Sequence, residues 1–240
     1  MISVIIPCHN YGKYISGCLK SIRNQTRKAD EIIVVDDKSD DETPKLVKKF
    51  RTVKYFRVEF GQANKTRNFG FKKSKGKYVM FFDADDSMRK DCIEKLFKAL
   101  QKDKKAGFAY SDRMDLMMKD EKIIRRERFR AKPWDLEKLK EGNYISMPAM
   151  IRRKYFKGFD EKLNRLQDWD LWLTIGKRAP GIWVSQTLFY SHRHLGGITT
   201  SANLVEADRY VRKKHKLAPM PSIKYLRIIL GAIKQAILGE

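Results

Sequence analysis

The stretch VMFFDADDSM, residues 79–88, joins four hydrophobic residues directly to a group of aspartates. The apolar run is typical of a strand that is buried on both faces of a parallel sheet. A turn after such a strand explains one aspartate, because Asp is common where the chain leaves regular structure. It does not explain Asp83, Asp85 and Asp86 together, since neighbouring carboxylates repel one another. The stretch therefore predicts a buried strand that ends at a site for a cation or a cationic ligand.

The sequence around this stretch alternates between strand-like and helix-like patterns. Short apolar runs rich in β-branched residues predict the strands, and amphipathic spacing predicts the helices. Strands are expected at 3–7, 31–37, 53–60 and 78–83, and helices at 13–25, 44–50, 62–73 and 91–100. This order predicts an α/β protein, with a Rossmann-like, mostly parallel central sheet flanked by helices. Ligands of such a sheet bind above the carboxyl ends of its strands.

The pattern becomes less regular after Phe108, where we expect mixed strands and one helix, at 167–178, that complete the same domain. Earlier in the chain, Thr43 followed by Pro44 predicts an N-cap and a first helical position. Since no linker interrupts the chain, one domain is expected over 1–200, followed by a basic amphipathic helical extension over 201–240.

Residues 222–238, SIKYLRIILGAIKQAIL, combine an apolar stripe with lysine and arginine on another face. The segment is short and charged for a transmembrane helix. It has both ingredients of interfacial binding, so we expect peripheral membrane contact through 221–238. Packing on a partner or on the chain's own domain is the alternative.

The composition limits the class of protein. The formal net charge is +23, from 52 Lys and Arg against 29 Asp and Glu, which favours anionic partners. No zinc finger, RNP motif or helix-turn-helix is present, so nucleic acid is not the expected partner. Three cysteines without CxxC spacing favour a reducing compartment, and no basic leader precedes the first apolar run. The expected location is the cytoplasm, with the inner face of the membrane as the expected site of action.

Acidic residues recur where predicted strands or loops end. Asp36 and Asp37 follow the second strand, and Asp168 with Asp170 occurs in LQDWDLW. Carboxylate oxygens suit Mg²⁺ or Mn²⁺, which usually binds one or two carboxylates together with phosphate and water. A metal-bound nucleotide diphosphate is therefore the expected ligand, and Asp168 is the candidate to accept a proton from an attacking hydroxyl.

Two other nucleotide-binding motifs are excluded. No G-x-G-x-x-G follows the first strand, as a dinucleotide-binding dehydrogenase requires. The stretch GFKKSKGKY, residues 70–78, differs from a P-loop because its glycines are one residue too far apart and Tyr78 stands where Ser or Thr should bind Mg²⁺. A metal ion is therefore expected to neutralise the phosphates.

Taken in order, these motifs resemble the family 2 glycosyltransferases, which have the GT-A fold and use nucleotide-activated sugars. The resemblance extends over most of the first 199 residues. The segments that carry it are SVIIPCHNYGKYISGCLKSIRNQT, EIIVVDDKSDDET, ANKTRNFGFKKSKGKYVMFFDADD, FDEKLNRLQDWDLWLTIG and HRHLGGIT.

The resemblance implies roles for the residues around the donor. Pro7 and Asp37 would line the nucleotide base pocket, with Asp37 hydrogen-bonded to the base. Arg67 would lie beside the base or the diphosphate. In the Asp-Ala-Asp signature, Asp85 matches the metal ligand, and Asp83 matches a residue that contacts ribose or metal.

The resemblance also implies the chemistry. Asp168 matches the general base, and His194 is similar to a residue that reaches the metal or the diphosphate in some members. The implied reaction is an inverting, metal-dependent transfer of a sugar from a nucleotide diphosphate, with a UDP-sugar favoured, to a hydroxyl of a glycan or lipid-linked acceptor. The cofactor is Mn²⁺ or Mg²⁺, and the implied context is cell-surface or lipid-linked glycan synthesis.

Two departures from the family pattern affect this interpretation. Gln167 stands where Glu usually precedes the base, and no Gln-x-x-Arg-Trp segment of processive synthases follows, so a single transfer is expected. Two other classes stay open at this point: a basic protein that binds nucleic acid or anionic lipid on a degenerate enzyme fold, and a nucleotide-sugar hydrolase or nucleotidyltransferase.

Overall fold

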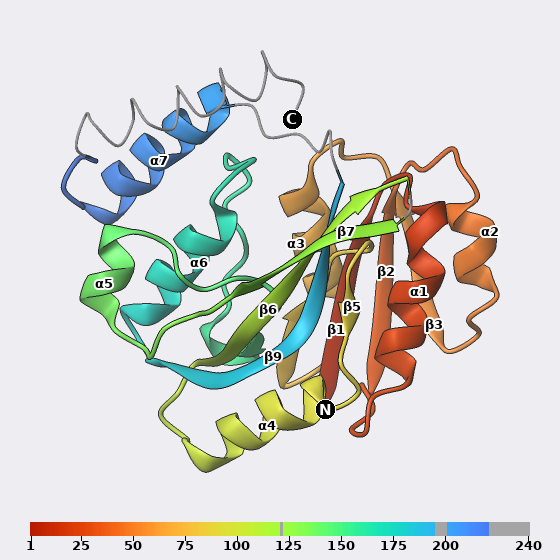
Figure 1. Cartoon of the computed structure of the whole chain (residues 1–240), viewed down its shortest axis with the longest axis horizontal. Coiled ribbons are helices and arrows are strands. Elements are labelled where there is room, and N and C mark those ends of the chain that lie inside the picture. The colour runs from red at the N-terminus through yellow and green to blue at the C-terminus, as the bar shows by residue number, and fades with distance from the viewer. Residues whose placement is uncertain (121, 195–200, 221–240) are drawn as a thin grey trace.

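The first half of the chain has the predicted alternation of strands and helices (Figure 1). The computed structural model describes residues 1–120, 122–194 and 201–220. The elements of the first half are β1 (Ile2–Cys8), α1 (Gly12–Arg23), β2 (Glu31–Asp37), α2 (Thr43–Lys48), β3 (Val53–Val58), α3 (Ala63–Lys73) and β4 (Tyr78–Phe81).

The second half is less regular, and the expectation of a single helix there is wrong. A short helix, α5, and a 3₁₀ turn, η1, accompany the expected helix α6. The elements are β5 (Ser87–Met88), α4 (Cys92–Lys102), β6 (Phe108–Lys119), β7 (Lys122–Phe129), α5 (Leu136–Glu141), β8 (Met150–Arg152), η1 (Arg153–Tyr155), α6 (Gln167–Gly176), β9 (Gly181–His194) and α7 (Ser201–His215). The charged strand β7 has no apolar alternation that would have predicted it, because almost all of its side chains are exposed.

The strands form one sheet in the order β3-β2-β1-β4-β8-β6-β9-β5, with β7 paired to β6. β3, β2, β1 and β4 are parallel to one another, β8 is antiparallel to β4 and β6, and β9 is parallel to β6. The parallel half confirms the predicted α/β architecture. The register pairs Ile5 with Ile33 and Phe81, so the carboxyl ends of β1, β2 and β4 lie at the same edge of the sheet.

Both faces of the parallel strands are buried under helices. Val4 and Ile6 of β1 belong to one apolar cluster, with residues of α1, α2 and α4. Ile5, which points to the other face, belongs to a second cluster with residues of α5, α6 and α7. This alternation follows from the two-residue period of a strand, and it explains the continuous apolar runs in the sequence.

Helix α3 lies unusually close to the sheet because of Gly70. A Cβ at this position would come within 2.5 Å of Ile5 Cγ2 and 3.1 Å of Val35 Cγ2. Only glycine permits this approach. The approach fixes the distance between the sheet and Arg67, which lies one helical turn earlier on α3.

The expected N-cap at Thr43 is wrong by one residue. Thr43 is the first residue of α2, and Glu42 precedes it without a side-chain capping bond. The Thr43 hydroxyl accepts the backbone N–H of Tyr11 instead, at 3.0 Å. The threonine therefore fastens the loop after β1, a long-range contact that local sequence does not reveal.

The described part of the expected C-terminal extension is the helix α7, which lies beside α6 (Figure 1). Ala207 and Val211 of α7 are buried in the second apolar cluster. Residues 221–238, the expected membrane-contacting segment, lie outside the described residues. Within the described ranges, no helix is both long enough and apolar enough to cross a membrane.

The second cluster includes Trp172 of α6. Its side chain is fully buried and stacks on Phe108 with ring centroids 4.7 Å apart. The indole Nε1–H donates to Ile145 O at 3.0 Å, so the ring also holds the segment before β8.

We predict that Trp172→Ala lowers the free energy of unfolding by about 3–5 kcal/mol, the usual cost of removing a buried aromatic side chain. Urea denaturation followed by circular dichroism measures this change. Ile124→Ala is the control, because Ile124 is 56% exposed, and we expect it to change the free energy by less than about 0.5 kcal/mol. Equal midpoints for the two variants would contradict the structural role of Trp172.

Candidate functional site

A cavity of about 790 Å³ opens at the carboxyl ends of β1 and β2 and beside the turn after β4. All five residues predicted to contact the donor line it: Pro7, Asp37, Arg67, Asp83 and Asp85. They come from four separate segments of the chain, so the parallel sheet brings them together. The position agrees with the rule that open α/β sheets bind ligands beyond the carboxyl ends of their strands.

The acidic turn begins directly after the buried end of β4. Asp86 N donates to Asp83 O at 3.2 Å, which closes the turn and places three carboxylates within four residues. Arg67 Nη2 donates to Asp83 Oδ1 at 3.0 Å, and the Arg67 side chain is only 8% exposed. The arginine neutralises one carboxylate of the turn from the opposite wall of the cavity.

The other two carboxylates of the turn form no ion pair within the described ranges, and they are harder to ionise. Burial, followed by repulsion from Asp83, raises the pKa of Asp85 to about 6. Burial raises the pKa of Asp86 as well, and Asp83 and Asp85 add to the effect. Like charges that raise one another's pKa in a partly buried turn favour a bound cation.

The metal-binding capacity of the turn is limited to a few side chains. Among the described residues, no group of three or more His, Cys, Asp or Glu side chains is arranged to hold a metal ion. A magnesium or manganese ion at Asp83 and Asp85 would therefore need further ligands from phosphate and water, which is how Mg²⁺ commonly binds. The side chain of His194 lies outside the described residues, so its role stays a prediction.

The carboxylate of Asp37 accepts four hydrogen bonds from the protein. Its Oδ1 accepts the N–H groups of Phe60 at 2.6 Å and Gly61 at 3.1 Å. Its Oδ2 accepts the N–H of Gln62 at 3.2 Å and the hydroxyl of Thr66 at 3.0 Å. Burial acts to raise the pKa of this carboxyl, but the four hydrogen bonds have the larger opposite effect, so the pKa lies below its ordinary value. Asp37 thus holds the loop that leads into α3, and the predicted contact with a base stays a prediction.

Asp168 lies in the first turn of α6, not at the end of a strand. Its Oδ2 accepts Asn143 Nδ2–H at 2.8 Å, and its Oδ1 accepts the N–H of Trp169 at 2.9 Å. Burial raises the pKa of Asp168 above the ordinary value for aspartate, although both hydrogen bonds oppose the shift. A buried carboxylate with a raised pKa is a better proton acceptor than an exposed one.

Asp168 is absent from the residues that line the cavity, but charged residues of β6 and β9 connect it to the acidic turn. Arg113 acts on the charge of Asp168 and donates to Asp115 Oδ1 at 2.7 Å. Arg193 of β9 donates to the same oxygen at 3.4 Å and acts on the charge of Asp85. Asp168 and the acidic turn are thus connected through Arg113, Asp115 and Arg193, whose charges alternate on the adjacent strands β6 and β9.

Several of these residues were missed by the sequence analysis. Asn143, which orients Asp168, lies in an irregular segment with no motif around it. Arg113 and Arg193 lie in basic stretches where most cations are solvated, so composition does not single them out. Thr66 was the most accessible to prediction, because it directly precedes Arg67 in the quoted segment.

Comparison with known proteins identifies the family. The sequence model of "Glycosyl transferase family 2" matches residues 3–159. A curated relative is the poly(ribitol-phosphate) β-N-acetylglucosaminyltransferase TarP of Staphylococcus aureus (strain N315). It is 37% identical over 103 residues, which are 40% of this chain and 32% of TarP. The chain spans less than two thirds of the length of such relatives, and only 17% of one of them.

Solved structures show the same fold. The structure of S. aureus TarS 1–349 in complex with UDP-GlcNAc has a TM-score of 0.73 at 20% identity, covering 97% of this chain and 71% of that one. The mannosyltransferase PcManGT of Pyrobaculum calidifontis, in complex with GDP-Man and Mn²⁺, has a TM-score of 0.64 at 17% identity, covering 98% and 69%. At these identities the likeness establishes the fold, which confirms the expected GT-A architecture.

The family match covers more than half of the chain, and it includes the acidic turn, Arg67 and Asp37. The protein therefore belongs to glycosyl transferase family 2.

Proposed function

We propose that the protein is an inverting, non-processive glycosyltransferase that moves a sugar from a nucleotide diphosphate, most simply UDP, to an acceptor hydroxyl. The observation that carries the proposal is the cavity that Arg67, Asp83 and Asp85 line together, with Arg67 paired to Asp83. Family membership supports it, as do the structural neighbours crystallised with UDP-GlcNAc and GDP-Man.

Asp83 and Asp85 would hold Mn²⁺ or Mg²⁺ together with the donor diphosphate. The residues fit such an ion, because Asp83 and Asp85 offer carboxylate oxygens in one cavity, and burial followed by repulsion from Asp83 makes Asp85 hard to ionise without a cation. When bound, the ion would stabilise the negative charge that grows on the leaving diphosphate. Arg67, whose Nε is buried and has no hydrogen-bond partner among the described residues, would donate to the same leaving group.

Asp168 would act as the general base. It would accept the proton of the acceptor hydroxyl while that oxygen forms a bond to the anomeric carbon. The bond from the anomeric carbon to the diphosphate oxygen breaks in the same displacement, and the nucleoside diphosphate leaves with the electron pair. One displacement inverts the anomeric configuration. Asn143 would orient the carboxylate of Asp168 through its hydrogen bond at 2.8 Å.

An anionic, phosphate-bearing glycan is the acceptor class that the charge supports best. The formal net charge is +23. Arg125, Arg126 and Arg128 of β7 are exposed on the strand next to the one that carries Arg113, although Arg125 pairs with Glu127 and Arg128 with Asp112. The relative TarP is named for a poly(ribitol-phosphate) acceptor, which is a polyanion of this kind. Contact with the inner membrane face through 221–238, or a lipid-linked acceptor, is proposed on the sequence pattern alone.

The decisive experiment incubates the full chain with Mn²⁺ and a panel of nucleotide sugars, and measures nucleoside diphosphate release with and without glycan acceptors. We expect acceptor-dependent release from one donor. Asp168→Asn should reduce turnover by about 100-fold to 10,000-fold, the range of general-base catalysis, while leaving UDP binding unchanged. Release that ignores the acceptor would indicate a hydrolase, and an Asp168→Asn variant with wild-type turnover would refute the assigned base.

The raised pKa of Asp168 predicts the pH dependence of turnover. The carboxyl must be ionised to accept a proton, so kcat should rise with pH through a pKa above the ordinary aspartate value of about 3.9. Removing the Asn143 hydrogen bond destabilises the charged form, so Asn143→Ala should move this acid limb upward by about one pH unit. The profile is measured at saturating Mn²⁺ and donor, and an unmoved limb would contradict the role of Asn143.

Metal removal should weaken donor binding through Asp85. We expect EDTA to lower the affinity for UDP at least about tenfold, a difference of about 1.4 kcal/mol, and Mn²⁺ to restore it. Asp85→Asn should bind UDP with equal affinity in EDTA and in Mn²⁺, as measured by calorimetry. Glu137→Gln, at a carboxylate that is 78% exposed on α5, is the control and should keep the Mn²⁺ dependence. Metal-independent binding by the wild type would overturn this assignment.

A further inference from the structure

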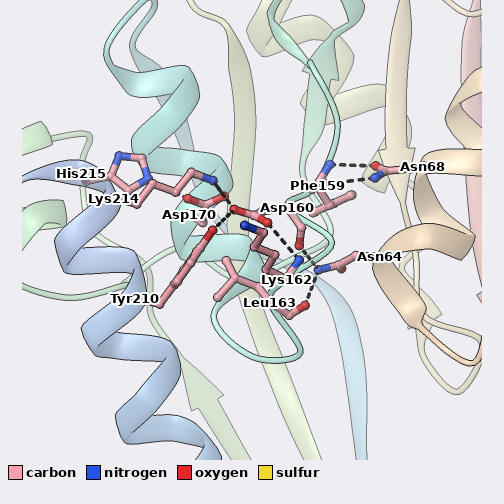
Figure 2. Close-up of polar contacts among 10 residues, drawn as sticks. All are labelled: Asn64, Asn68, Phe159, Asp160, Lys162, Leu163, Asp170, Tyr210, Lys214 and His215. Carbon is pink, nitrogen blue, oxygen red and sulfur yellow. Dashed lines mark hydrogen bonds and ion pairs between the residues drawn. The ribbon is translucent and has the colours of Figure 1, made fainter.

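The segment between η1 and α6 lies among three helices and has polar contacts with all of them. Figure 2 shows Phe159, Asp160 and Leu163 of this segment between side chains of α3 on one side and of α7 on the other. The neighbouring helix α6 contributes Asp170 to the same group of contacts. None of these contacts belongs to the cavity of the candidate site.

Two asparagines attach the segment to α3. Asn68 Nδ2 donates to Phe159 O at 2.9 Å, and Asn68 Oδ1 accepts Phe159 N–H at 2.8 Å. Asn64 Nδ2 donates to Asp160 O at 2.9 Å and to Leu163 O at 2.6 Å. Because backbone carbonyls only accept, this arrangement fixes the orientation of the Asn64 amide.

The fixed orientation of the Asn64 amide affects Arg67, which lines the cavity of the candidate site. Its Oδ1 can only face away from the two carbonyls, where it accepts Arg67 Nη1–H at 3.1 Å. Arg67 uses its other terminal nitrogen, Nη2, for Asp83. The backbone of the segment thus determines, through Asn64, where the guanidinium of Arg67 lies.

Lys214 of α7 attaches the same segment to α6. Its ammonium donates to Asp160 Oδ2 at 2.7 Å and to Asp170 Oδ2 at 2.9 Å. Tyr210 also donates to Asp160 Oδ2, at 3.0 Å, and His215 contacts Asp170 Oδ1 at 2.7 Å. Burial acts to lower the pKa of Lys214, but the bonds to the two carboxylates raise it above its ordinary value. The ammonium therefore stays charged between two carboxylates that would otherwise repel each other.

We propose that Lys214 is a positioning residue that sets the place of Arg67 relative to Asp168. Asp160 connects to Arg67 through Asn64, and Asp170 lies two residues beyond Asp168 on the same helix. The Nζ atom of Lys214 contacts both Asp160 and Asp170, so it connects the residues that position Arg67 to the helix that carries Asp168. The inference rests on the proposed function, since it assigns Arg67 to the leaving group and Asp168 to the acceptor.

The alternative is that Lys214 only stabilises the fold by holding α7 on the domain. The packing of α7 bears on this alternative. Val211 is fully buried in the second apolar cluster, so α7 is held on the domain without the ion pairs. Lys214→Met leaves Asp160 and Asp170 without the ammonium, which lowers stability. Tyr210 and His215 still contact these carboxylates, and the side chain of Lys214 is 35% exposed to water, so the variant should fold and its defect should appear in the relative position of Arg67 and Asp168.

The experiment compares Lys214→Met, Lys214→Arg and the control Lys213→Met in the full chain. Lys213 is an exposed neighbour on the same helix. We expect Lys214→Met to lower kcat about tenfold or more, because small misplacements of reacting groups are costly. Its UDP affinity and binding stoichiometry should stay within about twofold, a difference of about 0.4 kcal/mol. Lys214→Arg, which can also bridge two carboxylates, should recover most of kcat.

Amide hydrogen exchange provides a measurement that does not depend on sugar transfer. We expect faster amide exchange over 159–170 in Lys214→Met and unchanged exchange in Lys213→Met. Unchanged exchange in both variants would overturn the inference. A decrease in kcat of Lys214→Met that equals the decrease in its UDP-binding stoichiometry would also overturn it, because the loss would then reflect unfolded protein. If the wild type transfers no sugar from any donor, the proposed function fails, and the exchange data alone decide whether Lys214 couples the segment to α6.

Discussion

Repulsion among the carboxylates of Asp83, Asp85 and Asp86 is the constraint on which the candidate site depends. The turn that carries them follows a strand buried on both faces, so the carboxylates cannot separate without moving the core. Arg67 offsets the charge of Asp83. Burial, with this repulsion added to it, raises the pKa of Asp85 and Asp86. Such a turn at the mouth of a cavity supports the proposed cation site.

The side chains that balance this turn owe their positions to the backbone around them. Gly70 lets α3 approach β1 closely, and Asp37 gathers the N–H groups of the loop that leads into α3. Arg67 therefore projects from a helix whose start and whose distance from the sheet are both fixed. Asn64 then determines the direction of its guanidinium. The contacts of Gly70, Asp37 and Asn64 thus position one ion pair.

The sequence was sufficient for the features that depend on local periodicity. β1, β2 and β4 carry continuous apolar runs, and the apolar stripe of α1 is visible at Ile15, Leu19 and Ile22, all of which are buried. The acidic turn could be recognised because several carboxylates directly follow a buried strand. Asp168 was a candidate proton acceptor from its acidic motif. The roles of Asp37 and Arg67 depended on the resemblance to a family, because spacing alone does not relate residues so far apart.

The remaining features depend on tertiary contacts that leave no local pattern. Thr43 does not cap α2 because its hydroxyl is bonded to Tyr11, and β7 is a strand because β6 offers it a partner. Asn143 meets Asp168 only after the chain has folded around α6. Thr43 and Asn143 contact partners that are remote in sequence, whereas β7 pairs with the strand just before it but has no apolar alternation. None of these features has a periodicity for a sequence to display.

The two ends of the proposed reaction are positioned by different physical means. The acidic turn follows from hydrogen-bonded parallel strands and two apolar clusters, which are cooperative and hard to deform. Asp168 lies on α6, whose apolar side chains pack in the second of these clusters. The connection from α6 to α3 is polar, because it passes through the bridging ammonium of Lys214 and the backbone carbonyls of the segment before α6. Polar contacts of this kind are strongly directional but are broken by the loss of a single partner. The contacts of α7 are therefore the place where the geometry between donor and base can change without disturbing the sheet.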